Sequence, residues 1–89
     1  MSAAARTVTV RYFAAFREAL GTGSERVATQ AATLSALRDE LIARGGAHAE
    51  ALARGKAVRM ALDQLLVTDE QAALADGAEV AFFPPVTGG

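Results

Sequence analysis

The sequence predicts an α+β domain in which one main helix packs on one face of a mixed sheet of four to five strands. Three observations support this fold class. Alternating apolar and polar residues near both ends of the chain are typical of strands, and leucines at helical spacing mark one central segment. Glycines and prolines separate these segments. With 89 residues, of which 52% are hydrophobic, the chain suffices for one small core.

The amino-terminal part predicts two strands around a short helix. Residues 7–13 alternate and are rich in β-branched and aromatic side chains, which indicates the first strand. Its side chains divide between two faces, with Val8, Val10 and Tyr12 on one and Thr7, Thr9, Arg11 and Phe13 on the other. Residues 14–20 are expected to form a helix that ends at Gly21, and residues 24–28 form a candidate second strand.

The main helix follows Thr33, whose hydroxyl can accept a hydrogen bond from an orphan backbone N–H. Leu34, Leu37 and Leu41 fall on one apolar stripe that is expected to face the sheet. The remaining positions of the helix carry Arg38, Asp39, Glu40 and Arg44, and the pair Gly45-Gly46 predicts its end.

The second half predicts further strands and one more short helix. The expected elements are a helix over 47–54, a strand over 58–62, a turn at 63–64 into 65–68, a turn at Asp76-Gly77, and a last strand over 79–83. This order is typical of the ubiquitin-like β-grasp fold. A ferredoxin-like fold would need a second full-length helix, for which the segment 47–54 is too short. We expect a disordered extension over 1–6, the domain over 7–83 and an extended tail over 84–89.

Composition excludes several classes of function. The chain has no cysteine and one histidine, so disulfides, a zinc site and a Ser-His-Asp triad are not expected. Its formal charge of −1 gives no electrostatic footprint for nucleic acid. No apolar stretch approaches the roughly 20 residues of a membrane span, and the start does not resemble a signal peptide. We therefore expect a cytoplasmic protein that binds neither nucleic acid nor membrane.

The carboxyl terminus predicts a chemical role. A free carboxylate is ionised at neutral pH and is a poor electrophile, so it must be activated, for example as an acyl-adenylate made with ATP. Gly88 and Gly89 leave the terminal carbonyl uncrowded. Pro84 and Pro85 favour an extended path, and the six residues 84–89 can reach about 20 Å. We therefore expect the tail, including Val86 and Thr87, to insert into another protein.

The last strand predicts a docking site beside this tail. Val80 and Phe82 share one face, whereas Ala81 and Phe83 share the other. If the helix covers one face, the phenylalanine on the opposite face is free to contact a partner. The alternative is that both rings are buried in a central strand, and the sequence alone does not tell which of the two faces the partner.

The chain resembles the small subunit of molybdopterin synthase, a ubiquitin-like sulfur carrier. The resemblance is carried by two segments, Val10-Arg11-Tyr12-Phe13-Ala14-Ala15-Phe16-Arg17-Glu18 and Glu79-Val80-Ala81-Phe82-Phe83-Pro84-Pro85-Val86-Thr87-Gly88-Gly89. A looser likeness runs from Leu52 to Gln64, with Asp63 where the family usually has asparagine. Phe-Phe-Pro-Pro-Val before the terminal glycines is far more specific than Gly-Gly alone.

This resemblance implies a carrier that is not catalytic by itself. Gly89 would be adenylated by an adenylyltransferase similar to ubiquitin-activating enzymes and converted to a thiocarboxylate with sulfur from a sulfurtransferase. The tail would then enter the large synthase subunit and donate sulfur to cyclic pyranopterin monophosphate. Two large and two small subunits form a heterotetramer in the family. The candidate docking residues are Phe13, Arg17, Phe82 and Phe83, and no cofactor or metal is expected to be stably bound.

Three other functions fit the same tail. The chain could be a ubiquitin-like protein modifier conjugated through Gly89 to lysines of other proteins. It could be a sulfur carrier for thiamine or cysteine synthesis, although the Phe-Phe-Pro-Pro segment argues against this. It could also be an interaction domain in which the glycine pair has no chemical role.

Overall fold

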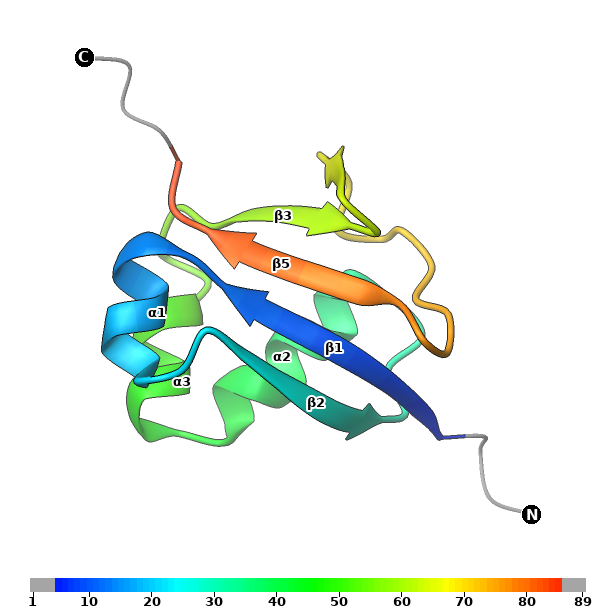
Figure 1. The fold of residues 1–89 in the computed structure, drawn as a ribbon, viewed down its shortest axis with the longest axis horizontal. Coiled ribbons are helices and arrows are strands. Elements are labelled where there is room, and N and C mark those ends of the chain that lie inside the picture. Colours follow the sequence, from blue (N-terminus) through cyan, green and yellow to red (C-terminus); the bar gives the residue numbers. More distant parts are fainter. Residues whose placement is uncertain (1–4, 86–89) are drawn as a thin grey trace.

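The computed structural model describes residues 5–85, which form a five-stranded sheet and three helices (Figure 1). The elements in chain order are β1 (Arg6–Tyr12), α1 (Ala14–Leu20), β2 (Ser24–Thr29), α2 (Leu34–Ala43), α3 (Gly46–Leu52), β3 (Arg59–Leu62), β4 (Leu65–Val67) and β5 (Glu79–Phe83). The predicted α+β class, with one main helix on a mixed sheet of the β-grasp type, is confirmed.

The last strand of the chain lies in the middle of the sheet. The strand order is β2-β1-β5-β3-β4, and β5 pairs in parallel with β1 and antiparallel with β3. The β1–β2 and β3–β4 pairs are antiparallel; α1 connects β1 to β2, whereas β3 and β4 form a hairpin with a two-residue turn. Because hydrogen-bonded neighbours hold β5 on both sides, the segment that follows it starts from one of the best-anchored strands of the fold.

The helices cover one face of the sheet and leave the other uncovered (Figure 1). Residues from α1, α2 and α3 pack with the buried strand residues into one core. Its fully buried side chains include Val8, Val10, Tyr12, Leu34, Leu37, Leu41, Leu52, Val80 and Phe82. The opposite face, called the open face below, holds the alternating strand residues, none of which is buried: Thr7, Thr9, Arg11, Ser24, Arg26, Ala28, Arg59, Ala61, Leu66, Glu79, Ala81 and Phe83.

Helix α2 begins and packs as its sequence predicts. The Thr33 hydroxyl accepts a hydrogen bond from the Ala36 backbone N–H at 3.1 Å. Leu34, Leu37 and Leu41 have no exposed surface. The cap removes one unpaired donor and the leucine stripe supplies the packing that a helix of this length needs in water.

We expect Thr33→Ala to lower the free energy of unfolding by about 1 kcal/mol, because the Ala36 N–H loses its acceptor. Urea unfolding followed by circular dichroism measures this loss. Thr33→Ser keeps the hydroxyl and serves as the matched control. Equal stability of the alanine and serine variants would contradict the capping role.

Several element boundaries differ from the prediction by one or two residues, and two of these differences have a physical reason. Strand β1 begins at Arg6, which pairs with Thr29 and donates to the Ala31 carbonyl at 3.2 Å, so Arg6 does not belong to the predicted disordered extension. Residues 1–4 lie outside the described residues. The short third helix ends at Leu52, two residues before the predicted end, because Arg54 turns toward α2 and hydrogen-bonds the Asp39 carboxylate at 2.9 Å.

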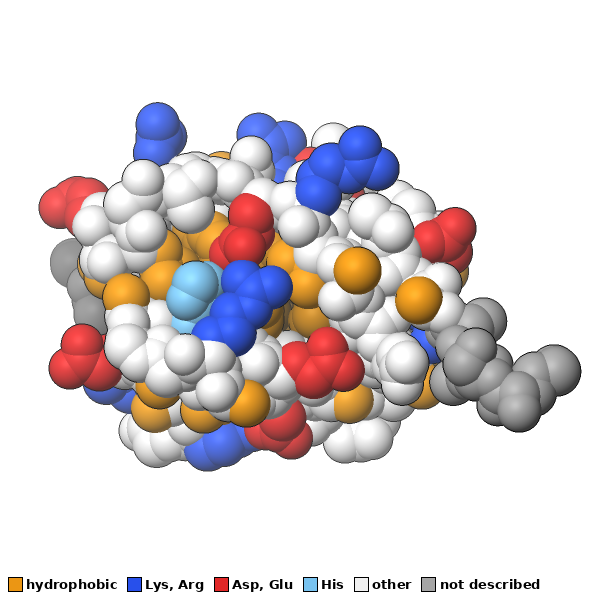
Figure 2. All heavy atoms as spheres, turned by 90° about the horizontal axis from the view of Figure 1, so that it is seen from below, with side chains coloured by type: hydrophobic (Ala, Val, Ile, Leu, Met, Phe, Trp, Pro, Cys, Tyr) orange, Lys and Arg blue, Asp and Glu red, His pale blue; other side chains and the backbone are white. Residues whose placement is uncertain are grey.

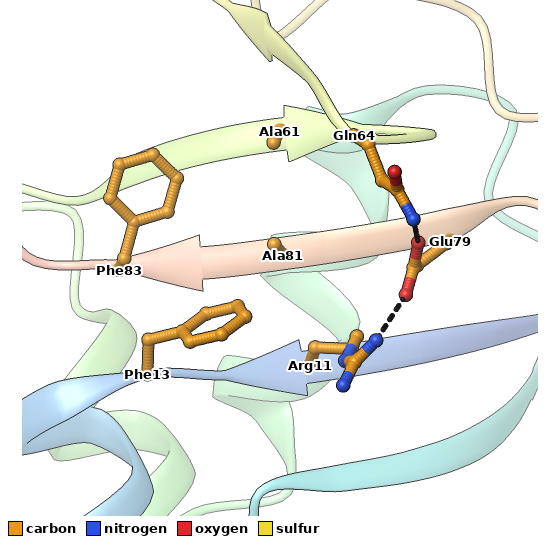
Figure 3. A pocket seen from close by; sticks show the side chains of 7 residues that line it. All are labelled: Arg11, Phe13, Ala61, Gln64, Glu79, Ala81 and Phe83. Atoms are coloured by element: carbon orange, nitrogen blue, oxygen red, sulfur yellow. Dashed lines mark hydrogen bonds and ion pairs between the residues drawn. The ribbon is translucent and has the colours of Figure 1, made fainter.

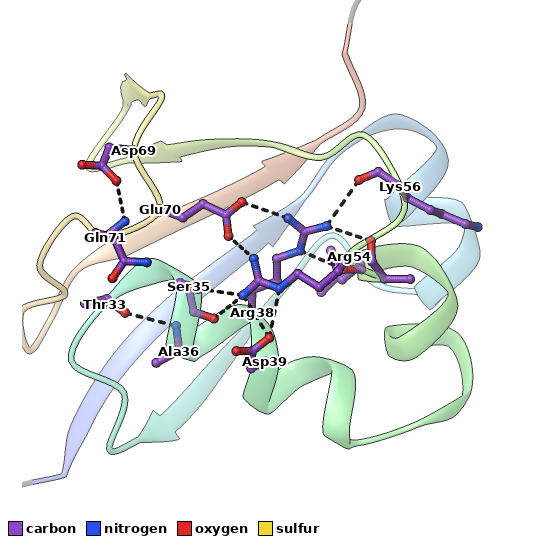
Figure 4. A network of polar contacts seen from close by, with 12 residues as sticks. Thr33, Ser35, Ala36, Arg38, Asp39, Arg54, Lys56, Asp69, Glu70 and Gln71 are labelled. Carbon is purple, nitrogen blue, oxygen red and sulfur yellow. Dashed lines mark hydrogen bonds and ion pairs between the residues drawn. The ribbon is translucent and has the colours of Figure 1, made fainter.

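The sequence assigns Arg38 to the polar side of α2, and the structure corrects this because the side chain is buried. It is 3% exposed, and Figure 4 shows its guanidinium inside a network of polar contacts. Nε donates to the Leu52 carbonyl and Nη2 to the Ala53 carbonyl, both at 2.8 Å, while Nη1 lies 3.1 Å from the Glu70 carboxylate. The side chain therefore satisfies carbonyls that the end of α3 leaves without helical partners.

A second polar cluster joins the helices to β1 and β2. The Tyr12 hydroxyl and the Arg44 guanidinium donate to the two carboxylate oxygens of Glu25, at 2.7 and 2.8 Å. His48 Nε2 lies 3.0 Å from the same carboxylate, and its ring meets Tyr12 edge-on with centroids 6.1 Å apart. Figure 2 shows the histidine beside basic and acidic side chains on this side of the molecule. His48 therefore connects α3 to the sheet and is only partly exposed.

We expect the contribution of Glu25 to stability to disappear in acid. Partial burial raises the pKa of this carboxyl, but hydrogen bonds from His48, Tyr12 and Arg44 outweigh burial and lower the pKa from 4.5 to about 2. A depressed folded-state pKa stabilises the fold above the unfolded value, and this stabilisation is lost as the pH falls toward about 2. In urea titrations the stability difference between wild type and Glu25→Gln should therefore be constant well above pH 4.5 and shrink as the pH falls from 4.5 to about 2.

Glu18→Gln, which removes an exposed carboxylate on α1, is the control for this acid effect. It should leave the pH dependence of stability close to that of wild type. A difference between wild type and Glu25→Gln that stays constant across the pH range would contradict the proposed ionic role.

Candidate functional site: the open face and the carboxyl-terminal segment

The described part of the predicted tail begins directly after the central strand. Pro84 and Pro85 are partly buried and follow Phe83, the last residue of β5. The remaining predicted tail residues, Val86, Thr87, Gly88 and Gly89, lie outside the described residues. Their roles stay predictions, whereas the structure defines the place from which they extend.

The two phenylalanines before the prolines point to opposite faces. Phe82 has no exposed surface and stacks on Tyr12 with ring centroids 6.3 Å apart. Phe83 is partly exposed and lies on the open face, directly opposite Arg59 of β3. The expectation that Phe82 docks a partner is therefore wrong, because helix-side packing occupies its ring. Phe83 is the residue of this pair that a partner can reach.

A hollow of about 400 Å³ lies on the open face beside Phe83. Phe13, which is 44% exposed, and Phe83 form two of its walls, while Ala61 and Ala81 leave space between them (Figure 3). Ala61 and Ala81 are direct cross-strand partners, so the two smallest side chains of the region lie side by side. An apolar side chain of another molecule fits this arrangement of aromatic walls and a small-residue floor.

A row of polar side chains closes one end of the hollow (Figure 3). Arg11 Nη1 donates to one Glu79 carboxylate oxygen at 2.9 Å, and the Gln64 amide donates to the other at 3.4 Å. The bond from Arg11, followed by that from Gln64, holds the pKa of Glu79 below its ordinary value. The hollow therefore combines an apolar middle with a charged end.

The turn that carries Gln64 is itself fixed to β5. Asp63 and Gln64 have φ angles of 51° and 70°, the left-handed conformation that two-residue hairpins use. Asp63 donates its N–H to the Glu79 carbonyl at 2.8 Å, and its carboxylate accepts the Glu79 N–H at 3.0 Å. At the start of the central strand, the Asp63 carboxylate thus takes the place of a backbone carbonyl as the acceptor for the Glu79 N–H.

Arg17 lies apart from the hollow that holds Phe13 and Phe83. It belongs to the last turn of α1 and is exposed, and its guanidinium packs across Gly23. A Cβ atom at Gly23 would come within 3.3 Å of Arg17 Nε. Phe13 and Phe83 are therefore brought together by the fold, whereas Arg17 contributes to a separate surface near the β1–β2 end.

Several residues of this surface were not singled out from the sequence. Arg11, Gln64 and Glu79 meet only because β1, β3 and β5 pair in the observed register. Leu65 and Leu66 on β4 are 72% and 63% exposed, and Leu66 lies opposite Ala61 on the open face. Alternation within a strand assigns residues to a face, but it does not say which strands are neighbours.

The described residues offer few sites for other chemistry. Residues 5–85 contain no group of three or more histidine, cysteine, aspartate or glutamate side chains placed to hold a metal ion. Among the helices formed by these residues, none has the length and apolar character that crossing a membrane requires.

The fold defines the class of this protein: a ubiquitin-like β-grasp domain whose carboxyl-terminal segment leaves from the central strand. The family model described as "ThiS family" matches residues 10–89, and the chain belongs to this family. It is 45% identical over 82 residues to the molybdopterin synthase sulfur carrier subunit of Escherichia coli K12, covering 92% of this chain and 99% of that protein. The Haemophilus influenzae protein of the same name is 41% identical over 80 residues, covering 90% and 96%.

Solved structures agree with this assignment. The HVO 2177 protein of Haloferax volcanii superposes with a TM-score of 0.77 at 29% identity, covering 96% of this chain and 88% of that one. A complex of subunits 1 and 2 of molybdopterin-converting factor from Helicobacter pylori contains a chain with a TM-score of 0.63 at 29% identity, covering 93% and 99%. The small archaeal modifier protein 1 of Methanosarcina acetivorans matches at 0.76 with 20% identity, covering 97% and 99%, a likeness of fold alone.

Proposed function

We propose that this chain is the sulfur-carrier subunit of a molybdopterin synthase and acts in the cytoplasm. The observation that carries the proposal is the 45% identity to a sulfur carrier subunit along 99% of that relative's length. The Gly-Gly ending and the segment Phe82-Phe83-Pro84-Pro85 before it supply the chemistry and the approach that such a carrier needs.

The proposed chemistry takes place at the carboxylate of Gly89. An adenylyltransferase joins this carboxylate to the α-phosphate of ATP and releases pyrophosphate. Sulfur at the oxidation level of sulfide, delivered by a sulfurtransferase system, then attacks the carbonyl carbon. A C–S bond forms, the C–O bond to the phosphate breaks, and AMP leaves with its electron pair. The product is a thiocarboxylate, whose sulfur is a far better nucleophile than the original oxygen. Transfer to cyclic pyranopterin monophosphate and hydrolysis of the acyl bond regenerate the carboxylate.

The composition of the chain supports a carrier that supplies only the reactive terminus. The chain has no cysteine, so no internal thiol competes for the activated carbonyl or forms a disulfide with the sulfur donor. It also has a single lysine and a single histidine. The carrier therefore supplies a reactive terminus, and the residues that bind and convert the pterin are expected on the large subunit. No cofactor is proposed to stay bound to the carrier itself.

The anchoring of β5 supports insertion of the tail into a partner. Neighbouring strands pair with β5 on both sides, and Phe82 is buried against Tyr12 directly before the prolines. A fixed base reduces the conformational entropy that is lost when the tail enters another active site. Phe13 and Phe83 lie beside this base and are proposed to dock the large subunit, with Arg17 as a contact farther away.

The proposed partners are the large synthase subunit, the adenylyltransferase and the sulfurtransferase. The first of these is supported by the Helicobacter pylori structure, which is named a complex of subunits 1 and 2 of molybdopterin-converting factor. By the same resemblance, two large and two small subunits are proposed to form a heterotetramer.

Intact-mass measurement combined with reconstitution tests this proposal. Incubation with the adenylyltransferase, ATP and a sulfur donor should raise the mass by the exchange of one oxygen for sulfur, with the change confined to Gly89. The product should convert cyclic pyranopterin monophosphate to molybdopterin when the large subunit is added. Gly89 found instead on lysines of other proteins, with no sulfur product, would contradict the proposal and favour a protein modifier.

A further inference from the structure

The open face carries a charge opposite to that of the rest of the chain. Among its strand residues are three arginines, at positions 11, 26 and 59, and one glutamate, at position 79. This gives the face a formal charge of +2. Because the whole chain carries −1, the remaining residues together carry −3. The formal charge is therefore unevenly distributed, and the positive side of the molecule is the uncovered face of the sheet.

The pairing register places the cations around the apolar hollow. Arg59 lies directly opposite Phe83, at the end of β5 from which the tail extends. Arg26 lies opposite Thr9, which in turn lies opposite Glu79, at the other end of the hollow and on the far side of β1. Residues that face each other across neighbouring strands project to the same side of the sheet. The two arginines therefore flank the hollow at diagonal corners.

Arg26 and Arg59 are available to another molecule. Both side chains belong to exposed residues, and no hydrogen bond or ion pair joins either guanidinium to another described residue. Arg11, by contrast, is bonded to Glu79 at 2.9 Å. Arg38 and Arg54 are also paired, on the helix side. Arg26 and Arg59, called the rim below, are thus the two arginines of the open face that have no ion pair among the described residues.

We infer that the open face docks an acidic protein surface: one that inserts an apolar side chain between Phe13 and Phe83 and presents carboxylates to Arg26 and Arg59. The inference rests on the proposed function, so the partner is the docking face of the large subunit. Long-range attraction between the rim and these carboxylates speeds the encounter, and the hollow supplies the short-range fit. A polyanion such as DNA would also meet the arginines, but its backbone has no group that fills an apolar hollow.

Association kinetics with the purified large subunit from the same host test the inference. For the wild-type chain the association rate constant should fall steeply as salt is added, because exposed charges are screened. The double variant Arg26→Glu/Arg59→Glu should associate at least about tenfold more slowly at low ionic strength and lose most of the salt dependence. The double variant Arg26→Lys/Arg59→Lys keeps the charge and should restore both the rate and its salt dependence.

Lys56→Glu is the control for net charge. It makes the change of charge of one arginine substitution, half that of the double variant, on the helix side, where Lys56 lies beside Glu50 and Ala15, and Figure 4 shows its side chain directed away from the Arg38 network. This variant should associate nearly as fast as wild type. Circular dichroism of every variant reports whether the fold is retained.

Three results would overturn the inference. The first is a wild-type association rate that does not respond to salt. The second is a loss of rate in Lys56→Glu that, per unit of charge changed, equals the loss in the open-face glutamate variant, since this would reflect net charge alone. The third is an open face that binds a DNA oligonucleotide while the large subunit binds elsewhere. If wild type supports molybdopterin formation in any of these cases, the proposed function stands while the inference fails. A wild-type chain that does not bind the large subunit at all contradicts both.

Discussion

Deletion of Gly89 is expected to abolish sulfur transfer while leaving the fold and the docking face intact. The shortened chain ends on the carboxylate of Gly88, about 3.5 Å short of the position that the activating and synthase active sites accept. A displacement of only about 1 Å can cost 100-fold in rate, so we expect product formation to fall by at least about 100-fold. The measurement is molybdopterin formed per carrier in the reconstituted reaction.

Two companion measurements separate chemistry from folding in this experiment. Among residues 5–85 the buried core ends at Phe82, so the urea midpoint of the deletion variant is expected to equal that of wild type. Thr87→Ser keeps the length and the terminal glycine, and it should retain most of the activity. A deletion variant that still forms molybdopterin at the wild-type rate would contradict the role assigned to the Gly89 carboxylate.

Much of the fold follows from local patterns that act within one element. The Thr33 cap and the leucine stripe predicted α2, and alternation grouped Val8, Val10 and Tyr12 on one face, which the structure buries. These features depend on side-chain periodicity, which a single segment carries in itself. Five strands and one long helix then leave few ways to bury every apolar face.

The buried charges could not be predicted in the same way. Arg38 occupies a position adjacent to the leucine stripe, but its polar head suggested solvent. The carbonyls of Leu52 and Ala53 accept hydrogen bonds from its guanidinium, and these carbonyls lie at the end of α3, which is distant in sequence. The contact of His48 with Glu25 likewise depends on β2, which lies far from His48 in the sequence. Such pairs depend on tertiary placement, which propensity and periodicity do not contain.

The candidate site was predictable in part for the same reason. The order Phe82-Phe83 guaranteed that one ring would lie on each face, but the choice depended on which face the helices cover. Predicting the hollow requires the strand order as well as the alternation. Phe13, which follows β1, and Ala61 of β3 both line the hollow only because the strands are ordered β1-β5-β3. A parallel neighbour far away in sequence is the least local contact of this fold.

Phe82→Ala and Phe83→Ala are expected to have opposite consequences, although the residues are adjacent. Phe82 is fully buried and stacked on Tyr12, so its truncation opens a cavity and should lower the free energy of unfolding by about 3–5 kcal/mol. That is a large share of the 5–15 kcal/mol typical of whole domains, and part of the variant should be unfolded at room temperature. Urea unfolding measures the loss.

Phe83→Ala removes a ring that is already partly exposed and should cost no more than about 1 kcal/mol in stability. The substitution is expected to weaken binding rather than folding, because the ring is one wall of the hollow that is proposed to face the partner. Affinity for the large subunit should fall at least about tenfold, which corresponds to about 1.4 kcal/mol. Titration calorimetry on the folded variant measures this change. If Phe83→Ala bound like wild type, the open face could not be the docking surface. If it unfolded like Phe82→Ala, the two faces of β5 would not differ as their burial indicates.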